Sequence, residues 1–160
     1  MKNITIRRAC PEDALIIKKI HVATYQKSYR GYVPDEYLDN MSLNADIIER
    51  TKNYLKTVEC WLAFYVDAPA GFGYVGEMDD KTFEIQALYV HPDYQKHGIG
   101  SALVNYLCKS KKEKGYKKCV AWTMKYGPSV SFYEKTKFIR TNQEKLWKFE
   151  IPIIKLEKTL

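Results

Sequence analysis

The stretch from residue 88 to residue 104 constrains the fold of this chain more than any other. An apolar run of β-strand character ends at Pro92, a short polar loop with two glycines follows, and an amphipathic helix is predicted from about Ser101. The start of a helix presents backbone N–H groups without intrahelical partners, and the helix dipole adds partial positive charge there. Because Gly98 and Gly100 have no Cβ to keep a ligand away, this junction predicts a site for a phosphate or pyrophosphate.

Two other phosphate-binding motifs are excluded. The chain has no Gly-Lys-Ser or Gly-Lys-Thr triplet, which a P-loop requires. Residues 71–76 match the dinucleotide fingerprint G-x-G-x-x-G, but turn-like residues 67–70 precede them. Another turn follows at 77–80, where a Rossmann site requires a helix. We therefore interpret residues 71–76 as a glycine-rich strand.

Length and composition favour a single globular domain over residues 1–160, because 46% of the residues are hydrophobic. No apolar run approaches the roughly twenty residues of a membrane-spanning helix, and the first eight residues have a strand pattern rather than a signal-peptide pattern. We expect a cytoplasmic protein with no membrane partner. The cysteines and histidines are scattered, with no C-x-x-C pair, so no metal site is predicted: Cys10, Cys60, Cys108, Cys119, His21, His91 and His97.

The net charge of +7 raises the question of nucleic acid, since Lys and Arg neutralise phosphates. The densest basic cluster, residues 109–118, lies at the predicted end of a helix and in the following turn, where cations complement the helix dipole. The same excess would attract a polyanionic cofactor. We expect no nucleic-acid partner and keep a basic nucleic-acid-binding regulator as an alternative.

Hydrophobic periodicity predicts the remaining elements. A strand at 3–8 precedes a helix opened by Pro11, a second helix begins near Pro34, and a third covers 44–56. The long helix at 101–114 has a predicted apolar face of Ala102, Leu103, Tyr106 and Leu107 and ends at Gly115. A short helix opened by Pro128 runs into another strand. The other predicted strands are 60–66, 71–76, 82–90, 118–124, 146–149 and 151–156.

The pattern Gln95-x-x-Gly98-x-Gly100, between a strand that ends Leu-Tyr-Val-His-Pro and a helix, resembles the acetyl-CoA signature of the GNAT superfamily of N-acyltransferases. Residues 132–135, Phe-Tyr-Glu-Lys, followed by Phe138, resemble the second half of that signature. Two positions depart from the family pattern. Lys137 stands where a glycine is common, and Tyr126 stands where many members have an asparagine near the cofactor.

The resemblance implies an α/β (α+β) GNAT fold. Its mixed, mostly antiparallel twisted sheet would have about six to seven strands, flanked by about four helices, with a central βαβ cofactor site. It also implies acetyl-CoA as the cosubstrate, with no metal, and it is compatible with a homodimer. The residues that match the family's cofactor-binding positions are Leu88, Tyr89, Val90, Gln95, Lys96, His97, Gly98, Ile99, Gly100, Ser101, Tyr126 and Ser129.

The same resemblance implies catalytic roles. Tyr133 matches the acid that protonates the departing thiolate, and its alternative role is core packing. A backbone N–H at the Leu88 position would polarise the thioester oxygen. Glu84 matches a carboxylate that acts as the base through water in some members; an ordinary strand carboxylate, with solvent as the base, is the alternative. Other members place the base two residues later, where Gln86 cannot take a proton.

Residues 24–42 are dense in tyrosine and resemble a stretch that covers the acceptor side of the active site in small GNAT proteins. Tyr29 and Tyr32 are expected to bind the acceptor, with packing as the alternative. The nearby carboxylates Asp35, Glu36 and Asp39 are interpreted as helix caps, with binding of a cationic amine as the alternative. The implied function is direct acetyl transfer, in a ternary complex, to a primary amine of a small molecule such as a polyamine or amino compound. Acetylation of protein or peptide amines is the alternative.

Overall fold

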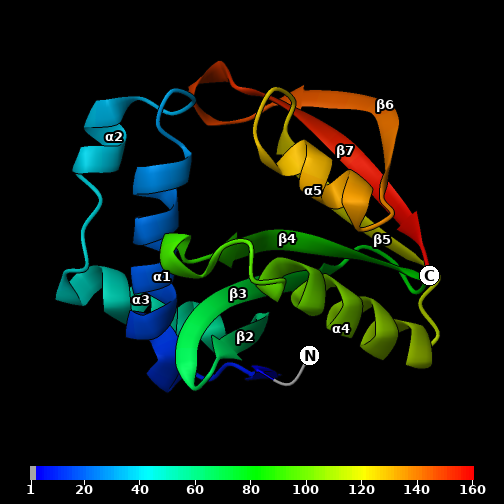
Figure 1. The fold of residues 1–160 in the computed structure, drawn as a ribbon, viewed down its shortest axis with the longest axis horizontal. Coiled ribbons are helices and arrows are strands. Elements are labelled where there is room, and N and C mark those ends of the chain that lie inside the picture. Colours follow the sequence, from blue (N-terminus) through cyan, green and yellow to red (C-terminus); the bar gives the residue numbers. More distant parts are fainter. Residues whose placement is uncertain (1–2) are drawn as a thin grey trace. The chain divides into compact units, whose positions relative to one another are not determined.

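The computed structural model describes residues 3–160. Its seven-stranded sheet has the order β1-β2-β3-β4-β5-β7-β6 (Figure 1). Strand β4 pairs with β5 in parallel, while the β1–β2, β2–β3, β5–β7 and β6–β7 pairs are antiparallel, so the prediction of a mixed sheet is confirmed. The strands are β1 (Ile4–Arg8), β2 (Glu59–Tyr65), β3 (Ala68–Glu77), β4 (Thr82–Val90), β5 (Lys118–Met124), β6 (Ile139–Leu146) and β7 (Pro152–Thr159).

The described residues form five α-helices, the number that the hydrophobic periodicity predicts, whereas the resemblance implied about four. Short 3-10 turns precede α1, connect β4 to α4, and connect β6 to β7. The α-helices are α1 (Ala14–Ser28), α2 (Asp35–Asp39), α3 (Ala45–Leu55), α4 (Ile99–Glu113) and α5 (Ser129–Lys135), and the 3-10 turns are η1 (Pro11–Asp13), η2 (Pro92–Tyr94) and η3 (Lys148–Glu150).

Contacts divide the chain into two compact units. The first unit comprises residues up to 75 together with 87–103, and the second comprises residues 76–86 together with 104–160. Strands β3 and β4 and helix α4 contribute residues to both units.

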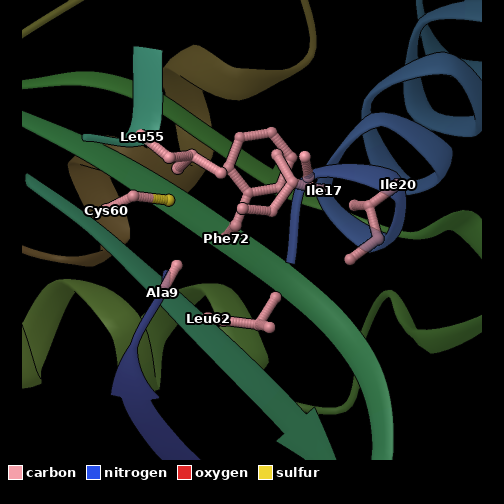
Figure 2. Close-up of a cluster of buried hydrophobic side chains, with 8 residues drawn as sticks. Ala9, Ile17, Ile20, Leu55, Cys60, Leu62 and Phe72 are labelled. Atoms are coloured by element: carbon pink, nitrogen blue, oxygen red, sulfur yellow. The ribbon is translucent and has the colours of Figure 1, made fainter. Parts of the chain in front are cut away.

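The first unit buries apolar side chains on both faces of its strands. On one face, α1 and α3 supply Ile17, Ile20 and Leu55, which pack with Leu62 and Phe72 of the sheet (Figure 2). A second cluster contains Ala63 and Ala70 from the strands with Ile99 and Leu103 from the start of α4. Because Leu62 and Ala63 are neighbours on β2, their side chains point to opposite faces. The first turn of α4 is therefore anchored on the face opposite to α1.

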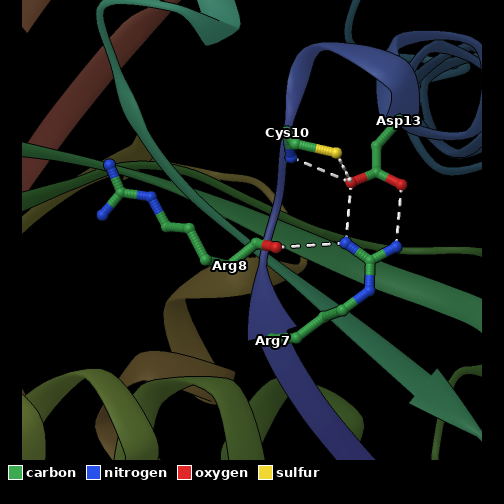
Figure 3. Close-up of polar contacts among 4 residues, drawn as sticks. All are labelled: Arg7, Arg8, Cys10 and Asp13. Atoms are coloured by element: carbon green, nitrogen blue, oxygen red, sulfur yellow. Dashed lines mark hydrogen bonds and ion pairs between the residues drawn. The ribbon is translucent and has the colours of Figure 1, made fainter.

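Helix α1 starts from a buried carboxylate. Both oxygens of Asp13 accept hydrogen bonds from the Arg7 guanidinium, at 2.7 and 2.8 Å, and the backbone N–H of Cys10 donates to the same carboxylate at 2.9 Å (Figure 3). These donors lower the pKa of Asp13 to about 2, and the Arg7 hydrogen bond is the largest cause. The bidentate pair fastens β1 to the turn η1 that opens α1.

Asp13 is expected to make the stability of the protein depend on acid pH. Its pKa falls from 3.8 to about 2 on folding, so its stabilisation is complete above the unfolded pKa and is lost as the pH falls through the folded value. The shift corresponds to about 2 kcal/mol. Urea unfolding of the parent and of Asp13→Asn should show a stability gap at pH 7 that narrows by about this amount towards pH 2. A gap that stays constant with pH would contradict the assignment.

The second unit contains the βαβ connection that the sequence predicts. Thr82–Ile85 of β4 pair with Lys118–Ala121 of β5, and β5 continues to Met124 along β7. Helix α4 ends in a Schellman motif: Gly115 has φ +94°, its N–H donates to Lys112, and the N–H of Tyr116 donates to Lys111. The terminator predicted at Gly115 is therefore confirmed.

Three local predictions are wrong. The turn placed at residues 67–70 is a two-residue hairpin turn at Val66 and Asp67, with φ +47° and +69°, and β3 begins at Ala68. Tyr106 lies on the exposed side of α4, whose buried hydrophobic residues are Ile99, Leu103, Val104, Leu107 and Cys108. The strand predicted after the short helix is β6, and Leu146 is its last residue, so the separate strand predicted at 146–149 is wrong. The polar, exposed residues of β6 show no alternation that would mark where it ends.

Candidate functional site

Side chains at the end of β4 alternate between the two faces of the sheet, so the predicted residues of that strand lie on opposite faces. Leu88 and Val90 pack on the cluster that contains Ile99 and Leu103 of α4, whereas Tyr89 packs against Phe72 on the other face. A Cβ on Gly71 of β3 would lie 2.8 Å from the carbonyl oxygen of Tyr89. This close approach explains a glycine in the motif at 71–76, which lies within β3 as predicted.

Polar side chains hold the carbonyl of Val90, the last residue of β4. It accepts a hydrogen bond from Nε2 of Gln95 at 3.0 Å, and Oγ1 of Thr24 on α1 lies 3.2 Å away. The Gln95 amide also lies 3.4 Å from Oγ of Ser28. The Gln95 side chain, a predicted cofactor ligand, therefore ties its own loop to the end of β4 and to α1. The next residue is fixed as well, because the N–H of His91 donates to Ala70 at 2.8 Å.

Thr24 and Ser28 were missed by the sequence analysis. They lie four residues apart on α1, so both face the same direction. A pair of hydroxyl residues at helical spacing is the signal that could have identified them, but it does not identify their partner. Gln95 lies 67 positions after Ser28, and Val90 lies 66 positions after Thr24.

The loop after η2 takes two left-handed residues, Lys96 with φ +65° and Gly98 with φ +82°. Nδ1 of His97 lies 2.9 Å from the carbonyl oxygen of Gln95 and 3.2 Å from that of Tyr94. Because carbonyl oxygens only accept, Nδ1 of His97 carries a proton. The side chain of His97 thus stabilises the turn that leads into Gly98.

Helix α4 begins at Ile99, two residues before the predicted start. The carbonyl of Gly98 accepts the first helical hydrogen bond, from the N–H of Ala102 at 2.9 Å. Gly100 and Ser101 therefore belong to the first turn of the helix rather than to the loop. The N–H groups of Ile99, Gly100 and Ser101 precede the first intrahelical donor, so they are the groups that can bind an anion. The buried Ile99 side chain holds this turn in place.

The predicted acceptor residue Tyr29 lies in a cluster of aromatic rings. Its ring centroid is 4.4 Å from that of Tyr25 and 6.4 Å from that of Tyr89, and the hydroxyls of Tyr25 and Tyr89 are 3.2 Å apart. Burial raises the pKa of Tyr29 and of Tyr89 above the usual range, so both phenols stay neutral at physiological pH. Tyr32, the other predicted acceptor residue, is 41% exposed beyond the end of α1.

The carboxylates near these tyrosines do not cap α2, contrary to the sequence prediction. Arg30 donates from Nη1 to Asp35 at 3.1 Å and from Nη2 to Asp39 at 2.6 Å, and the residue before the helix is Pro34. The Arg30 guanidinium, two residues after the end of α1, binds both carboxylates because it offers several donors. Its single positive charge offsets one of the two carboxylate charges.

The proposed catalytic pair lies in the second unit. Glu84 is half-buried on β4, in register with Val120. Tyr133 on α5 is only 6% exposed, and its ring centroid lies 5.2 Å from those of Phe132 and Phe138. The predicted cofactor residue Ser129 is the first residue of α5, and Tyr126 is 73% exposed before it. The structure thus divides the predicted site residues between the two units.

Residues 3–160 contain no group of three or more His, Cys, Asp or Glu side chains arranged to hold a metal ion. Within the same range, no helix has both the length and the apolar composition needed to cross a bilayer.

Comparison with known proteins finds that this chain is similar to acetyltransferases. Residues 18–138 match the model of the acetyltransferase (GNAT) family. The uncharacterized N-acetyltransferase YuaI of Bacillus subtilis is 25% identical over 139 residues, which cover 82% of this chain and 78% of YuaI.

Solved structures show the same fold at lower identity. A GCN5-related N-acetyltransferase from Rhodopseudomonas palustris has a TM-score of 0.81 at 21% identity and covers 100% of this chain and 98% of its own. The PaiA N-acetyltransferase of Thermoplasma acidophilum, in complex with coenzyme A, has a TM-score of 0.78 at 21% identity, with 98% and 99% covered. YncA of Salmonella typhimurium, with acetyl-CoA, has a TM-score of 0.69 at 20% identity, with 99% and 94% covered.

Proposed function

Because the chain belongs to the acetyltransferase (GNAT) family and is an acyltransferase, we propose that it transfers the acetyl group of acetyl-CoA directly to a primary amine of a small molecule, such as a polyamine or an amino compound. The observation that carries this proposal is the junction of β4, the glycine loop and α4. Gly98 turns the chain with φ +82°, and the first turn of α4 follows it immediately. Such a turn suits the pyrophosphate of coenzyme A.

The residues at this junction fit the proposed cosubstrate. The N–H groups of residues 99–101 would bind the pyrophosphate, while Lys96 and His97 flank it. The backbone from Leu88 to Val90 would hold the pantetheine arm, with the N–H at Leu88 polarising the thioester oxygen. This role is compatible with the observed register, in which β4 pairs with β5 only up to Ile85 and then continues to Val90. Tyr126 and Ser129 are proposed as further cofactor contacts.

Two side chains are proposed to move protons. The amine must be neutral to attack, and Glu84 would accept its proton through a water molecule. The sulfur that leaves needs a proton, and Tyr133 would donate it from its hydroxyl, since a tyrosine is neutral and can donate a proton at neutral pH. The new amide N–C bond forms as the thioester C–S bond breaks. Tyr29 and Tyr32 are proposed to contact the acceptor.

Three further expectations are proposals with indirect support. Residues 1–160 would form one domain, which is compatible with solved relatives that cover 98–100% of this chain. The protein would act in the cytoplasm. Its acceptor would be a small molecule rather than a protein amine, because polar side chains already tie the end of β4 to α1.

A thiol-release assay tests the proposed function. The purified protein would be incubated with acetyl-CoA and a panel of polyamines, amino acids, amino alcohols and peptides, with release of free thiol measured over time. We expect release that requires a particular amine and yields the N-acetylated product by mass spectrometry. The absence of amine-dependent release across the panel would contradict the proposal.

Replacing Glu84 tests its role as the base. Glu84→Gln keeps the size of the side chain but cannot accept a proton, so kcat/KM should fall near neutral pH, by about 10²-fold or more for a general base. The loss should shrink as the pH approaches the pKa of the acceptor amine, where neutral amine is abundant. The measurement is a pH–rate profile of variant and parent.

A second variant makes this test specific. Adding Gln86→Glu to Glu84→Gln moves the carboxylate two residues along the same face of β4, where it should restore part of the activity near neutral pH. Parallel pH profiles for all three proteins would show that Glu84 has no role in proton transfer.

A further inference from the structure

A hollow of about 490 Å³ lies in the first unit, beside the end of β4. Helix α1 forms one wall with Ala23, Gln26 and Lys27, which share one face of the helix, and Arg30 extends this wall just beyond the helix end. The residues that directly follow β4, at positions 91–93, form the other wall. The volume is in the range that holds a small metabolite.

The lining of this hollow is mostly apolar, and most of its polar groups are hydrogen-bond donors. Among the described residues, the Lys27 ammonium forms no ion pair, so its charge is available to a ligand. Arg30 uses one N–H of Nη1 for Asp35 and one of Nη2 for Asp39, and its remaining N–H groups stay in a fixed orientation.

The opposite wall adds a donor and one carboxylate. Nδ1 of His91 accepts a hydrogen bond from the N–H of Asp93 at 3.2 Å, so a neutral His91 carries its proton on Nε2 and donates from there. The carboxylate of Asp93 is 77% exposed and lies 3.8 Å from Nδ1 of His91. Donors therefore outnumber acceptors on the walls, and the lining suits an anionic group.

We propose that this hollow binds a carboxylate or phosphate group of the acceptor, so that the substrate is a small amine that also carries an anion. The proposal rests on the proposed acetyl transfer and selects the class of acceptor within it. A second ammonium group, as in a polyamine, would meet the Lys27 and Arg30 cations of the lining, and Arg30 already donates to both Asp35 and Asp39. Leu88 and His91 are three residues apart, a span of at most about 10 Å. The anion and the reacting amine should therefore be separated by a short chain.

A matched series of amines tests the class of acceptor. The members share one five-carbon skeleton and differ in the group opposite the amine: δ-aminovalerate, aminopentyl phosphate, aminopentanol and cadaverine. One charge-assisted contact should raise kcat/KM of an anionic amine about tenfold or more over that of aminopentanol. The carboxylate and phosphate members distinguish the two sources of the anion. Equal kcat/KM for δ-aminovalerate, aminopentyl phosphate and aminopentanol would overturn the proposal while leaving acetyl transfer intact.

Lysine variants assign the preference to this hollow. Lys27→Met should reduce the preference for anionic amines to nearly onefold, whereas Lys19→Met, which removes an exposed lysine elsewhere on α1, should leave it unchanged. An equal loss in both variants would show a general charge effect and would overturn the site.

Calorimetry with the same anionic amines, without acetyl-CoA, gives a readout that does not depend on catalysis. We expect Lys27→Met to bind at least about tenfold more weakly than the parent. If no amine is acetylated, the proposed function fails, and binding that depends on Lys27 still supports the hollow as an anion site. Binding that does not depend on Lys27, or no binding, overturns it.

Discussion

Replacing Tyr133 by phenylalanine is expected to lower kcat about 10²-fold or more, with little change in the affinity for acetyl-CoA. The substitution removes one hydroxyl and keeps the ring, which packs between Phe132 and Phe138. A departing thiolate that receives no proton recaptures the acetyl group more readily, so the loss should appear in kcat rather than in binding. Steady-state kinetics with the best acceptor, together with calorimetry of acetyl-CoA binding, measure the two quantities separately.

A control variant separates this chemistry from the loss of a hydroxyl as such. The hydroxyl of Tyr116 donates to Glu77 at 2.6 Å, away from the proposed chemistry, so Tyr116→Phe should leave kcat within about twofold of the parent. Thermal unfolding of both variants checks that the fold is retained. If Tyr133→Phe retains the full kcat while chemistry is rate-limiting, Tyr133 has only the packing role.

Replacing Gly100 by valine is expected to weaken acetyl-CoA binding by about 10²-fold or more. Gly100 lies in the first turn of α4, where its N–H is one of the three proposed to bind the pyrophosphate. A branched side chain at that point would prevent the phosphates from reaching the backbone, and each lost charge-assisted hydrogen bond costs about 1.5–3 kcal/mol. Calorimetry with acetyl-CoA measures the loss directly.

The matched control places the same side chain elsewhere on the helix. Asn105 is exposed on α4, so Asn105→Val places the same branched side chain on the helix, away from its first turn. We expect this variant to bind acetyl-CoA like the parent. Unchanged affinity in Gly100→Val would mean that the pyrophosphate is not held at the start of α4.

The sequence alone predicts the elements that have a strong local signal. The proline at position 11 opens a helix, Gly115 ends one, and the apolar run before Pro92 is a strand, as the structure confirms. These signals are local because they depend on φ angles, missing N–H groups and the spacing of apolar residues within a few positions. Family membership was also predictable, since the signature around Gly98 is contiguous.

Local sequence predicts the ends of helices and strands less well, because contacts with distant residues decide where they begin and end. The first turn of α4 begins at Ile99 rather than at Ser101, because the side chain of Ile99 is buried against Ala63 and Ala70. The strand predicted after the short helix is β6, but the sequence did not predict where it ends, because nearly all its residues are exposed and show no alternation. Its pairing with β7 sets its extent.

Tertiary structure alone decided the partners of the polar side chains around the candidate site. Gln95 donates to Val90 at the end of β4 and also approaches Ser28 of α1. Arg30 binds two carboxylates that the sequence analysis had assigned to the start of a helix. Hydrogen bonds and ion pairs between distant segments have no periodicity and no fixed spacing, because folding brings the two groups together only after each element has formed. The sequence therefore determined the family and the position of the glycine loop, while the folded chain determined what holds that loop and which charged side chains lie beside it.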